Sequence, residues 1–477
     1  MQEETIAHKT ARTSIWGGVE KVSTLGISFI VSIVLARLLS PSDYGAIAML
    51  SVFIAIAGQF INCGFGNALI RKPDCTHVDY STAFYFNLFV SLVCYAILFI
   101  AAPGIARFYK MDLLCPVLRV TGLTLPLDAL RLVQNAILTK TLKAEKSALI
   151  QLCSALISGG ISIIMAVKGF GVWSLVAQQL SSGLVCLIIL WLASDWYPRL
   201  EFSMESLKYL WGFGSKMLLT GIISSTYANI YSIVIGRCYD GGILGVFNRG
   251  QRFARLFPEI TESVLVKNSL PILSQLQNDK ERLIHVYREF IKLACFIVFP
   301  AVCLTALLAE PFVRLVLTEK WMDSVIYIQI FAVTALFYPA NSINLNLLQT
   351  YGRSDYTLKA EVIKKSIGLA TVFLLLPLGP KWLAIGACVM DVLALSVNAF
   401  FAKKLSGLSY KLQLLDIFPV IVCTMVTAIC VFLLCQMIQG DLVKLLAGGI
   451  LGLIIYFIMT KYIFQMDIYE KIFSLVK

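Results

Sequence analysis

Charged residues are scarce in this sequence. Asp, Glu, Lys and Arg make up 14% of the 477 residues, whereas hydrophobic residues make up 58% and the mean hydropathy is +0.81. A soluble domain carries about 25% charged residues, so the composition excludes an ordinary soluble globular protein. It predicts an all-α polytopic membrane protein instead.

Sequence motifs of catalysis and metal binding are also missing. No P-loop, G-x-S-x-G, H-E-x-x-H or D-x-D pattern occurs, which argues against ATP-driven transport, hydrolysis and metal-dependent sugar-nucleotide chemistry. The 3 histidines, His8, His77 and His285, have no partners at metal-ligand spacing. The 13 cysteines stand in apolar runs without C-x-x-C spacing and are interpreted as small hydrophobic residues. We therefore expect no metal, no disulfide and no cofactor.

Long polar loops are absent as well. No segment between apolar runs exceeds about twenty residues, which leaves no room for a folded extramembrane domain. The first apolar run, residues 15–39, is too long for a signal-peptide core, so we expect it to be retained as the first helix. The net charge of +12 is explained by basic loops that orient the protein in a bilayer, and no nucleic-acid partner is expected.

Apolar runs long enough to cross a bilayer are abundant, and the length criterion predicts about fourteen of them. Counted from a cytoplasmic N-terminus, the inside loops hold about twice as many Lys and Arg residues as the outside loops. Both termini are therefore predicted to be cytoplasmic. The predicted spans are residues 14–38, 44–70, 83–108, 113–138, 148–167, 170–193, 209–236, 244–268, 290–317, 324–349, 357–378, 382–401, 417–437 and 445–460.

The chain repeats a short pattern. The W-G-x-x-x-K motif that ends at Lys21 recurs in the seventh span, where it ends at Lys216. Gly45, at the start of the second span, has a counterpart in Gly245, and both offsets are about 200 residues. Because six is an even number, two six-helix copies would be parallel repeats. We predict an N-terminal six-helix lobe (1–200), a C-terminal six-helix lobe (201–405) and two additional transmembrane helices (406–477).

The most charged predicted span is 244–268, LGVFNRGQRFARLFPEITESVLVKN. At 100° per residue its three arginines and two glutamates fall within an arc of about 140°, so one wall of the helix is polar. Each arginine near the bilayer centre costs about 2.5 to 3.5 kcal/mol, so such a wall persists only where it meets water or opposite charge. We interpret it as a wall of a substrate cavity. Its charged residues are Arg249, Arg252, Arg255, Glu259 and Glu262.

The three arginines are candidate substrate-binding residues. Arginine suits phosphate-bearing ligands because its planar guanidinium donates two parallel hydrogen bonds to phosphoryl oxygens. If the helix starts outside at Leu244, Arg255 lies about 16 Å down, near mid-bilayer, with Arg249 and Arg252 nearer the outer mouth. The alternative is that Arg255 only pairs with Glu259 at i+4, while the other two arginines reach outward to water.

Two lysines extend the candidate cationic cavity. Lys21 and Lys216 occupy matching places in the two copies, one to two helical turns inside the predicted cytoplasmic ends of their spans. Their symmetric placement favours a cavity role. The alternative is that both side chains reach back to the inner membrane interface.

The carboxylates near these basic residues are candidates for charge pairs or coupling. Glu20 and Glu262 are candidate coupling-ion sites for Na⁺ or H⁺, and Glu262 has the alternative role of offsetting the arginines. Glu259 is a candidate charge-pair partner. Asp128 and Arg131, three residues apart in the fourth span, are interpreted as a structural pair.

Three stretches of the sequence carry a family resemblance. They are K-T-x(3)-S-x-W-G at 9–17, L-A-R-L-L-S-P-S-D-Y-G-A-I-A-M at 35–49 and I-G-R-C-Y-D-x(3)-L-G-V-F-N-R-G-Q-R at 235–252. These stretches resemble the polysaccharide transporter family, and within it the lipopolysaccharide O-unit and colanic-acid exporter branch. That branch belongs to the multidrug/oligosaccharidyl-lipid/polysaccharide flippase superfamily. The resemblance covers most of the chain.

The resemblance implies two six-helix lobes around a cationic central cavity, lined by the first, second, seventh and eighth helices. It also implies two extra helices, which form a lipid-facing groove in some members. The implied substrate is an undecaprenyl-pyrophosphate-linked oligosaccharide that is moved to the outer leaflet of the bacterial cytoplasmic (inner) membrane for surface polysaccharide biosynthesis. Other implied partners are membrane lipid, a polysaccharide polymerase and further assembly proteins.

These features together predict a flippase that works by alternating access, a transporter and not an enzyme. A drug/cation antiporter of the same superfamily is the first alternative. It calls for a membrane-embedded acid as the main site, whereas the most charged span has more bases than acids near its centre. A membrane glycan polymerase or ligase is the second alternative. It requires a large outer loop or an outward-facing acid/base cluster, and the sequence predicts neither.

Overall fold

The computed structural model describes residues 23–62, 65–72, 74–141, 144–408 and 410–464. Within these ranges every regular element is a helix, and no strand occurs. In the same ranges 9 helices are long and apolar enough to cross a membrane, or 10 if the bent pair Leu218–Ala228 and Ile230–Cys238 is one span. The prediction of an all-α, multi-pass membrane protein is confirmed, whereas the number of fourteen spans stays a prediction.

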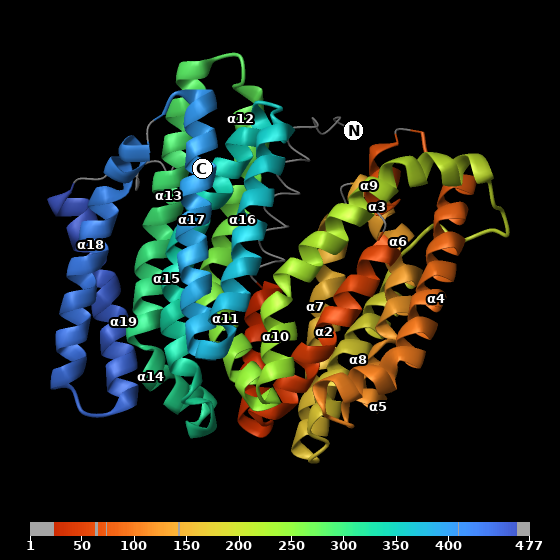
Figure 1. Ribbon diagram of the computed structural model, residues 1–477, viewed down its shortest axis with the longest axis horizontal. Helices are drawn as coiled ribbons and strands as arrows, with labels where there is room; N and C mark the ends of the chain where they lie inside the picture. Colours follow the sequence, from red (N-terminus) through yellow and green to blue (C-terminus); the bar gives the residue numbers. More distant parts are fainter. Residues whose placement is uncertain (1–22, 63–64, 73, 142–143, 409, 465–477) are drawn as a thin grey trace, which may run out of the picture. The chain divides into compact units, whose positions relative to one another are not determined.

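The chain divides into two compact units, Met1–Gly245 and Val246–Lys477, and helix α11 (Gly241–Thr261) crosses the boundary (Figure 1). The unit boundary lies within the predicted C-terminal lobe of residues 201–405. The division into two six-helix lobes and two additional helices stays a prediction. Each unit is described by itself below.

The first unit is made of long helices and a few short ones. After an apolar helix over Ser23–Leu38, it contains α2 to α10 and the first turn of α11. The bounds are α2 Pro41–Asn62, α3 Phe65–Arg71, α4 His77–Tyr109, α5 Leu114–Thr121, α6 Thr124–Lys140, α7 Ala144–Val167, α8 Val172–Leu192, α9 Met204–Ala228 and α10 Ile230–Cys238. The predicted spans 113–138 and 209–236 are therefore each divided, the first at Gly122 and the second at Asn229.

Two glycines of the repeated pattern permit a very close backbone contact in the first unit. A Cβ atom on Gly45 of α2 would lie 1.8 Å from the carbonyl oxygen of Gly241. A Cβ atom on Gly245 would lie 2.0 Å from the carbonyl oxygen of Pro41. The first turns of α2 and α11 therefore meet backbone against backbone, which only glycine allows. The two contacts are reciprocal. Gly245 corresponds to Gly45 and Gly241 corresponds to Pro41, at the offset of about 200 residues seen in the sequence.

The described part of the second unit holds the rest of α11 and eight further α-helices. In it α13 packs against both α15 and α18, and α18 and α19 lie side by side (Figure 1). The bounds are α12 Lys267–Gln275, α13 Lys280–Leu307, α14 Ala309–Phe312, α15 Ser324–Thr350, α16 Ser354–Leu375, α17 Pro380–Ser406, α18 Tyr410–Met437 and α19 Asp441–Ile458.

The charged span predicted over 244–268 lies inside a longer continuous helical segment. Helix α11 is followed directly by a π-helical turn, Glu262–Val266, and then by α12. Pro258 lies inside α11, where its ring crowds the preceding turn and its nitrogen cannot donate a hydrogen bond. The π-helical turn begins four residues later.

Candidate functional site

The structure separates the five charged side chains that the helical arc placed on one wall of α11. Arg252, Arg255 and Glu259, in the middle of the arc, are exposed. Arg249 lies at one edge and is only 3% exposed, and Glu262 lies at the other edge and is half-buried. The middle of the wall is therefore accessible, whereas its two edges turn into the protein.

Arg249 is packed among aromatic side chains of the second unit. Its guanidinium carbon lies 5.3 Å from the ring centroid of Trp321, which is 0% exposed, and 5.1 Å from that of Phe253. Next to it, a Cβ atom on Gly250 would lie 2.4 Å from the Cβ atom of Tyr327, so α11 and α15 are in close contact here. These cation–π contacts hold the Arg249 side chain inside the unit. A role for Arg249 in substrate binding stays a prediction.

Arg255 stands among polar groups of three neighbouring helices. Its positive charge interacts electrostatically with the hydroxyl of Tyr338 in α15 and with the carboxyl group of Asp391 in α17. Lys364 of α16 also acts on Asp391, and its side chain is 14% exposed and paired with Glu361. The structure thus brings Arg255 of α11 near Tyr338 of α15 and near Asp391 of α17, and it brings Lys364 of α16 near the same Asp391.

Hydrogen bonds join this charged cluster to the helices behind it. The Tyr338 hydroxyl donates to the carboxylate of Glu262 at the start of the π-helical turn. The Asn341 side-chain amide donates to the backbone carbonyl oxygen of Asp391 at 3.2 Å, and Asn398 donates to the Asn341 side-chain oxygen at 3.1 Å. The bonds attach the π-helical turn and α17 to α15.

Tyr338, Lys364 and Asp391 were not among the candidate site residues predicted from the sequence. Asp391 and Lys364 lie inside predicted spans, and a charge within an apolar run is a signal of function that was available. Tyr338 has no comparable signal, because a tyrosine in an apolar run is common. What the sequence could not show is that Tyr338 and Asp391 lie near Arg255, and that Lys364 lies near Asp391, since these residues are on different helices.

The remaining predicted site residues have mixed outcomes. Glu20 and Lys21 lie outside the described residues. Lys216 is a residue of α9, but its side chain is outside the described part of the chain. The predicted pair of Asp128 and Arg131 is confirmed, with 2.5 Å between the guanidinium and the carboxylate.

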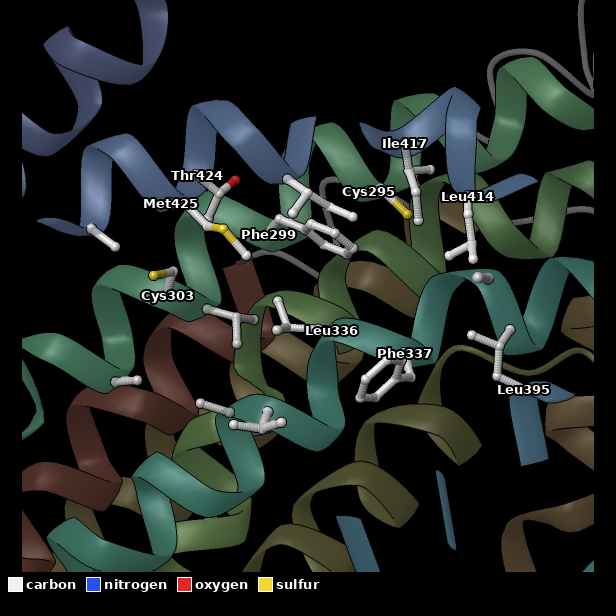
Figure 2. A pocket seen from close by; sticks show the side chains of 17 residues that line it. Cys295, Phe299, Cys303, Leu336, Phe337, Leu395, Leu414, Ile417, Thr424 and Met425 are labelled. Carbon is white, nitrogen blue, oxygen red and sulfur yellow. The ribbon is translucent and has the colours of Figure 1, made fainter. Parts of the chain in front are cut away.

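An apolar cavity of about 380 Å³ lies in the second unit between α13, α15, α17 and α18 (Figure 2). Figure 2 shows Phe299 from α13, Leu336 and Phe337 from α15 and Ile417 and Met425 from α18 around it. Apart from thiols and one threonine, every lining side chain is a hydrocarbon or a thioether. A cavity of this kind accepts a hydrocarbon chain and offers almost nothing to a polar group.

Polar contacts hold α18 beside this cavity. The guanidinium of Arg288 in α13 donates two hydrogen bonds of 2.6 Å to the Asp416 carboxylate in α18. Deeper in the unit, the hydroxyl of Tyr287 donates to the side-chain oxygen of Asn344 at 2.6 Å, and the Asn344 amide donates to Gln413 at 3.3 Å. A bidentate pair fixes both distance and orientation, so α18 is an integral wall of the cavity.

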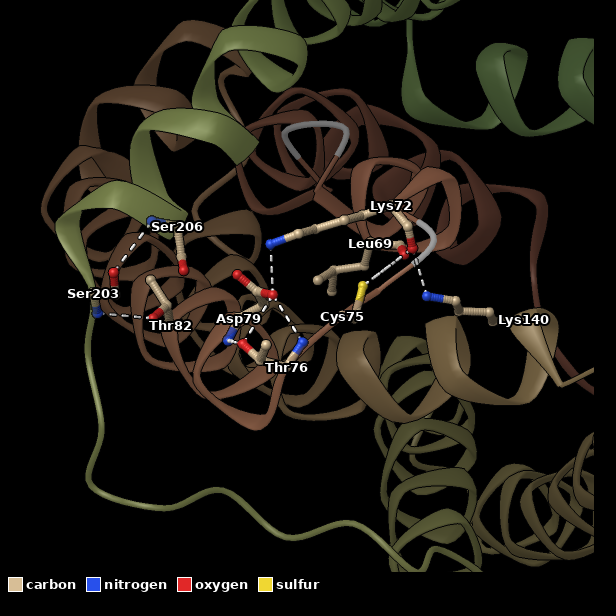
Figure 3. A network of polar contacts seen from close by, with 9 residues as sticks. All are labelled: Leu69, Lys72, Cys75, Thr76, Asp79, Thr82, Lys140, Ser203 and Ser206. Carbon is tan, nitrogen blue, oxygen red and sulfur yellow. Dashed lines mark hydrogen bonds and ion pairs between the residues drawn. The ribbon is translucent and has the colours of Figure 1, made fainter.

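The first unit has a polar network of another kind, shown in Figure 3. The Lys72 ammonium lies 2.7 Å from the carboxylate of Asp79, which also accepts from the backbone N–H of Thr76 in a capping box at the start of α4. Lys140 at the end of α6 donates to the Lys72 carbonyl oxygen at 2.5 Å. The hydrogen bond to Asp79 raises the pKa of Lys72 above its usual value.

The same network attaches the connection between α8 and α9. The backbone N–H of Ser203, which caps α9, donates to the Thr82 hydroxyl at 3.0 Å, and that of Arg199 donates to the Ser81 hydroxyl at 3.2 Å. The start of α9 is therefore bonded to the first turns of α4. These contacts order the fold, and their charged groups are already paired.

Comparison with known proteins identifies the family. The model of the polysaccharide biosynthesis protein family matches residues 34–326, which is more than half of the chain. The chain belongs to this family. The family resemblance inferred from the sequence is confirmed.

Relatives of this polysaccharide biosynthesis protein have names from the same field. It is 26% identical over 318 residues to the succinoglycan biosynthesis transport protein ExoT of Rhizobium meliloti (strain 1021), covering 66% of this chain and 64% of that relative. It is 21% identical over 446 residues to the lipopolysaccharide biosynthesis protein WzxC of Escherichia coli (strain K12), covering 92% of this chain and 90% of the relative.

Solved structures show the same fold. The lipid II flippase MurJ in an inward closed conformation matches with a TM-score of 0.77 at 13% identity, covering 94% of this chain and 99% of that chain. An inward-facing multidrug resistance transporter of the MATE family matches with a TM-score of 0.64 at 17% identity, covering 80% of this chain and 94% of that chain. At these identities the likeness concerns the fold alone.

Proposed function

We propose that this membrane protein is a flippase for a lipid-linked saccharide of surface polysaccharide biosynthesis. The substrate is an oligosaccharide on undecaprenyl pyrophosphate, moved by alternating access from the cytoplasmic to the outer leaflet of the bacterial inner membrane. Arg255, with Arg252, neutralises the pyrophosphate. Both chain termini lie in the cytoplasm, and polysaccharide polymerase and other assembly proteins receive the product.

The observation that carries this proposal is that the second unit has both exposed arginines and an apolar cavity, in a chain that belongs to the polysaccharide biosynthesis protein family. Helix α11 exposes Arg252 and Arg255, and α13, α15, α17 and α18 enclose a cavity with hydrocarbon walls. An anionic head group and a long apolar tail are the two parts of a polyprenyl pyrophosphate. Guanidinium groups favour the first part and the cavity favours the second.

The charged cluster also bears on the alternative of a drug/cation antiporter, which needs an acid as its main site. Asp391 is subject to the charges of Arg255 and Lys364, and Glu262 accepts a hydrogen bond from Tyr338. An acid that already lies near two basic side chains disfavours a cationic drug. Coupling to Na⁺ or H⁺ through Glu20 or Glu262 stays a proposal, because some bias must drive net transport.

The decisive experiment deletes the gene in the native bacterium and follows the lipid-linked oligosaccharide. We expect the oligosaccharide to accumulate on the inner leaflet and surface polysaccharide to be lost, with restoration by the wild-type gene on a plasmid. Export at the wild-type level without accumulation would contradict the flippase. A gain of drug sensitivity with normal export would support the antiporter instead.

A further inference from the structure

A small cavity in the first unit offers polar groups that the fold itself does not use. It has a volume of about 150 Å³ and lies where the C-terminal ends of α6 and α8 meet. Gln134 lines it from α6 and is 1% exposed. Among the described residues, neither polar atom of the Gln134 amide has a hydrogen-bond partner. The indole N–H of Trp196, also at the cavity, has none in the same part of the chain.

Buried polar groups of this kind are costly. Each unsatisfied neutral group destabilises a fold by about 1 to 3 kcal/mol, which is why most buried groups are bonded. In this unit the neighbouring Lys72, Asp79 and Lys140 follow that rule and are hydrogen-bonded. Gln134 departs from it at the wall of a cavity, so a bound polar molecule would recover the cost.

The donors and acceptors at the cavity define the chemistry of that molecule. The Gln134 amide provides two donors and an acceptor, and Trp196 provides one donor. Asp195, which also lines the cavity, provides an acidic acceptor. A bound anion would be repelled by the Asp195 carboxylate, and a bound cation would meet the N–H groups of Gln134 and Trp196. Hydroxyl groups suit this set, because each hydroxyl both donates and accepts.

The size and the other walls of the cavity narrow the ligand further. Its volume equals about five waters of the liquid, close to that of a single six-membered sugar ring and too small for an oligosaccharide. Ile137, Leu138 and Leu190 supply apolar walls that match the C–H faces of such a ring. We propose that this cavity binds one neutral sugar ring.

The sugar has two possible sources, a free monosaccharide or one sugar of the lipid-linked saccharide. Only the second source rests on the proposed function. The experiment uses the purified full-length protein in lipid nanodiscs and measures the unfolding temperature against sugar concentration. The probes are glucose, galactose and N-acetylglucosamine in one arm, and the same sugars on a water-soluble short-chain isoprenyl pyrophosphate in the other.

We expect at least one probe to raise the unfolding temperature saturably. Gln134→Leu should weaken its binding at least about tenfold, since two or more hydrogen bonds are lost. Trp196→Phe, which removes only the N–H donor, should weaken it a few fold. Saturation by a free sugar assigns the site to monosaccharides, and saturation by the lipid-linked probes alone assigns it to the carrier-bound saccharide.

Asn87→Leu is the matched control. Asn87 in α4 is 0% exposed, and its amide likewise has no hydrogen-bond partner among the described residues, but it does not line the cavity. This variant should bind sugar as the wild type does. An equal loss in Asn87→Leu, unchanged binding in Gln134→Leu, or no saturable shift with any probe would mean that the cavity holds water only, and would overturn the proposal. Accumulation of lipid-linked oligosaccharide in the deletion strain is read separately, so failure of the sugar site and failure of the flippase are distinguishable.

Discussion

Two charged sites, one in each unit, differ in whether their charges are already paired. In the first unit, Lys72, Asp79 and Lys140 are bonded to one another or to the backbone at the ends of helices. In the second unit, Arg252 and Arg255 are exposed in the middle of a long helix. A charge that is already paired stabilises the fold, whereas an exposed charge on a helix of a membrane protein remains available for a ligand.

The same contrast exists within α11 itself. Arg249 is buried against Trp321, and Arg255 is exposed two turns later near Asp391. Identical side chains on one helix thus have different surroundings. The difference teaches that the type of residue alone does not distinguish an anchoring charge from a binding charge.

The largest effect is expected from Arg255→Ala. Loss of the guanidinium removes the main partner of the pyrophosphate, so export of surface polysaccharide should fall below about a tenth of the wild-type level. Protein abundance should stay normal, because the side chain is exposed. Arg314→Ala, which removes another exposed arginine of the second unit, is the control and should export normally. Full export by Arg255→Ala would show that the exposed charge is not used.

Asp79→Ala should instead act on stability. It removes the buried carboxylate that holds Lys72 and caps α4, which we expect to lower the free energy of unfolding by about 2 to 4 kcal/mol. Thermal unfolding and abundance in the membrane measure this. Asp74→Ala, at an exposed position five residues earlier, should change neither. A stable Asp79→Ala protein that fails to export would show that Asp79 acts in transport and not in stability.

Arg249→Ala sharpens the comparison within α11. Loss of its contacts with Trp321 and Phe253 should reduce stability by about 1 to 3 kcal/mol, while the surviving protein still exports. Export normalised to the amount of folded protein separates this variant from Arg255→Ala. If normalised export is lost and stability is unchanged, Arg249 binds substrate as the sequence predicted.

The smallest effect concerns pH. The pKa of Lys72 is raised from 10.5 by its bond to Asp79, so the stabilisation by this pair is present below pH 10.5 and declines as the pH rises through the raised value. Because the Lys72 side chain is 26% exposed, we expect a loss below about 1 kcal/mol. The difference in unfolding temperature between wild type and Lys72→Met, followed from pH 8 to 11.5, should shrink at the alkaline end. If the difference in unfolding temperature stayed constant over this pH range, the Lys72–Asp79 pair would not stabilise the protein.

Much of the fold could be predicted from hydropathy. The span predicted over 324–349 is α15, Ser324–Thr350, because a long apolar run in lipid must bond its own backbone as a helix. The breaks were not predictable in the same way. The span predicted over 113–138 is divided between α5 and α6 around Gly122, where the Tyr95 side chain of α4 would lie 3.0 Å from an added Cβ atom. Tyr95 belongs to a neighbouring helix, and hydropathy does not contain information on such contacts.

The candidate site was predictable only in part. The charged segment was found because arginines within an apolar helix are costly, and its helical conformation is as expected. The burial of Arg249 depends on Trp321, and the surroundings of Arg255 depend on Tyr338 and Asp391. These residues come from other helices, so the periodicity of one helix cannot place them.

The sequence alone determined that this is a helical membrane protein, which helix carries the most charge and which family the chain belongs to. These properties follow from local composition and short motifs, because the cost of placing polar groups in lipid is set residue by residue. Only the tertiary structure decided which arginines are exposed, where an apolar cavity forms and which buried amides are left without a partner in the described fold. Such properties depend on contacts between helices, and no single segment of the chain contains them.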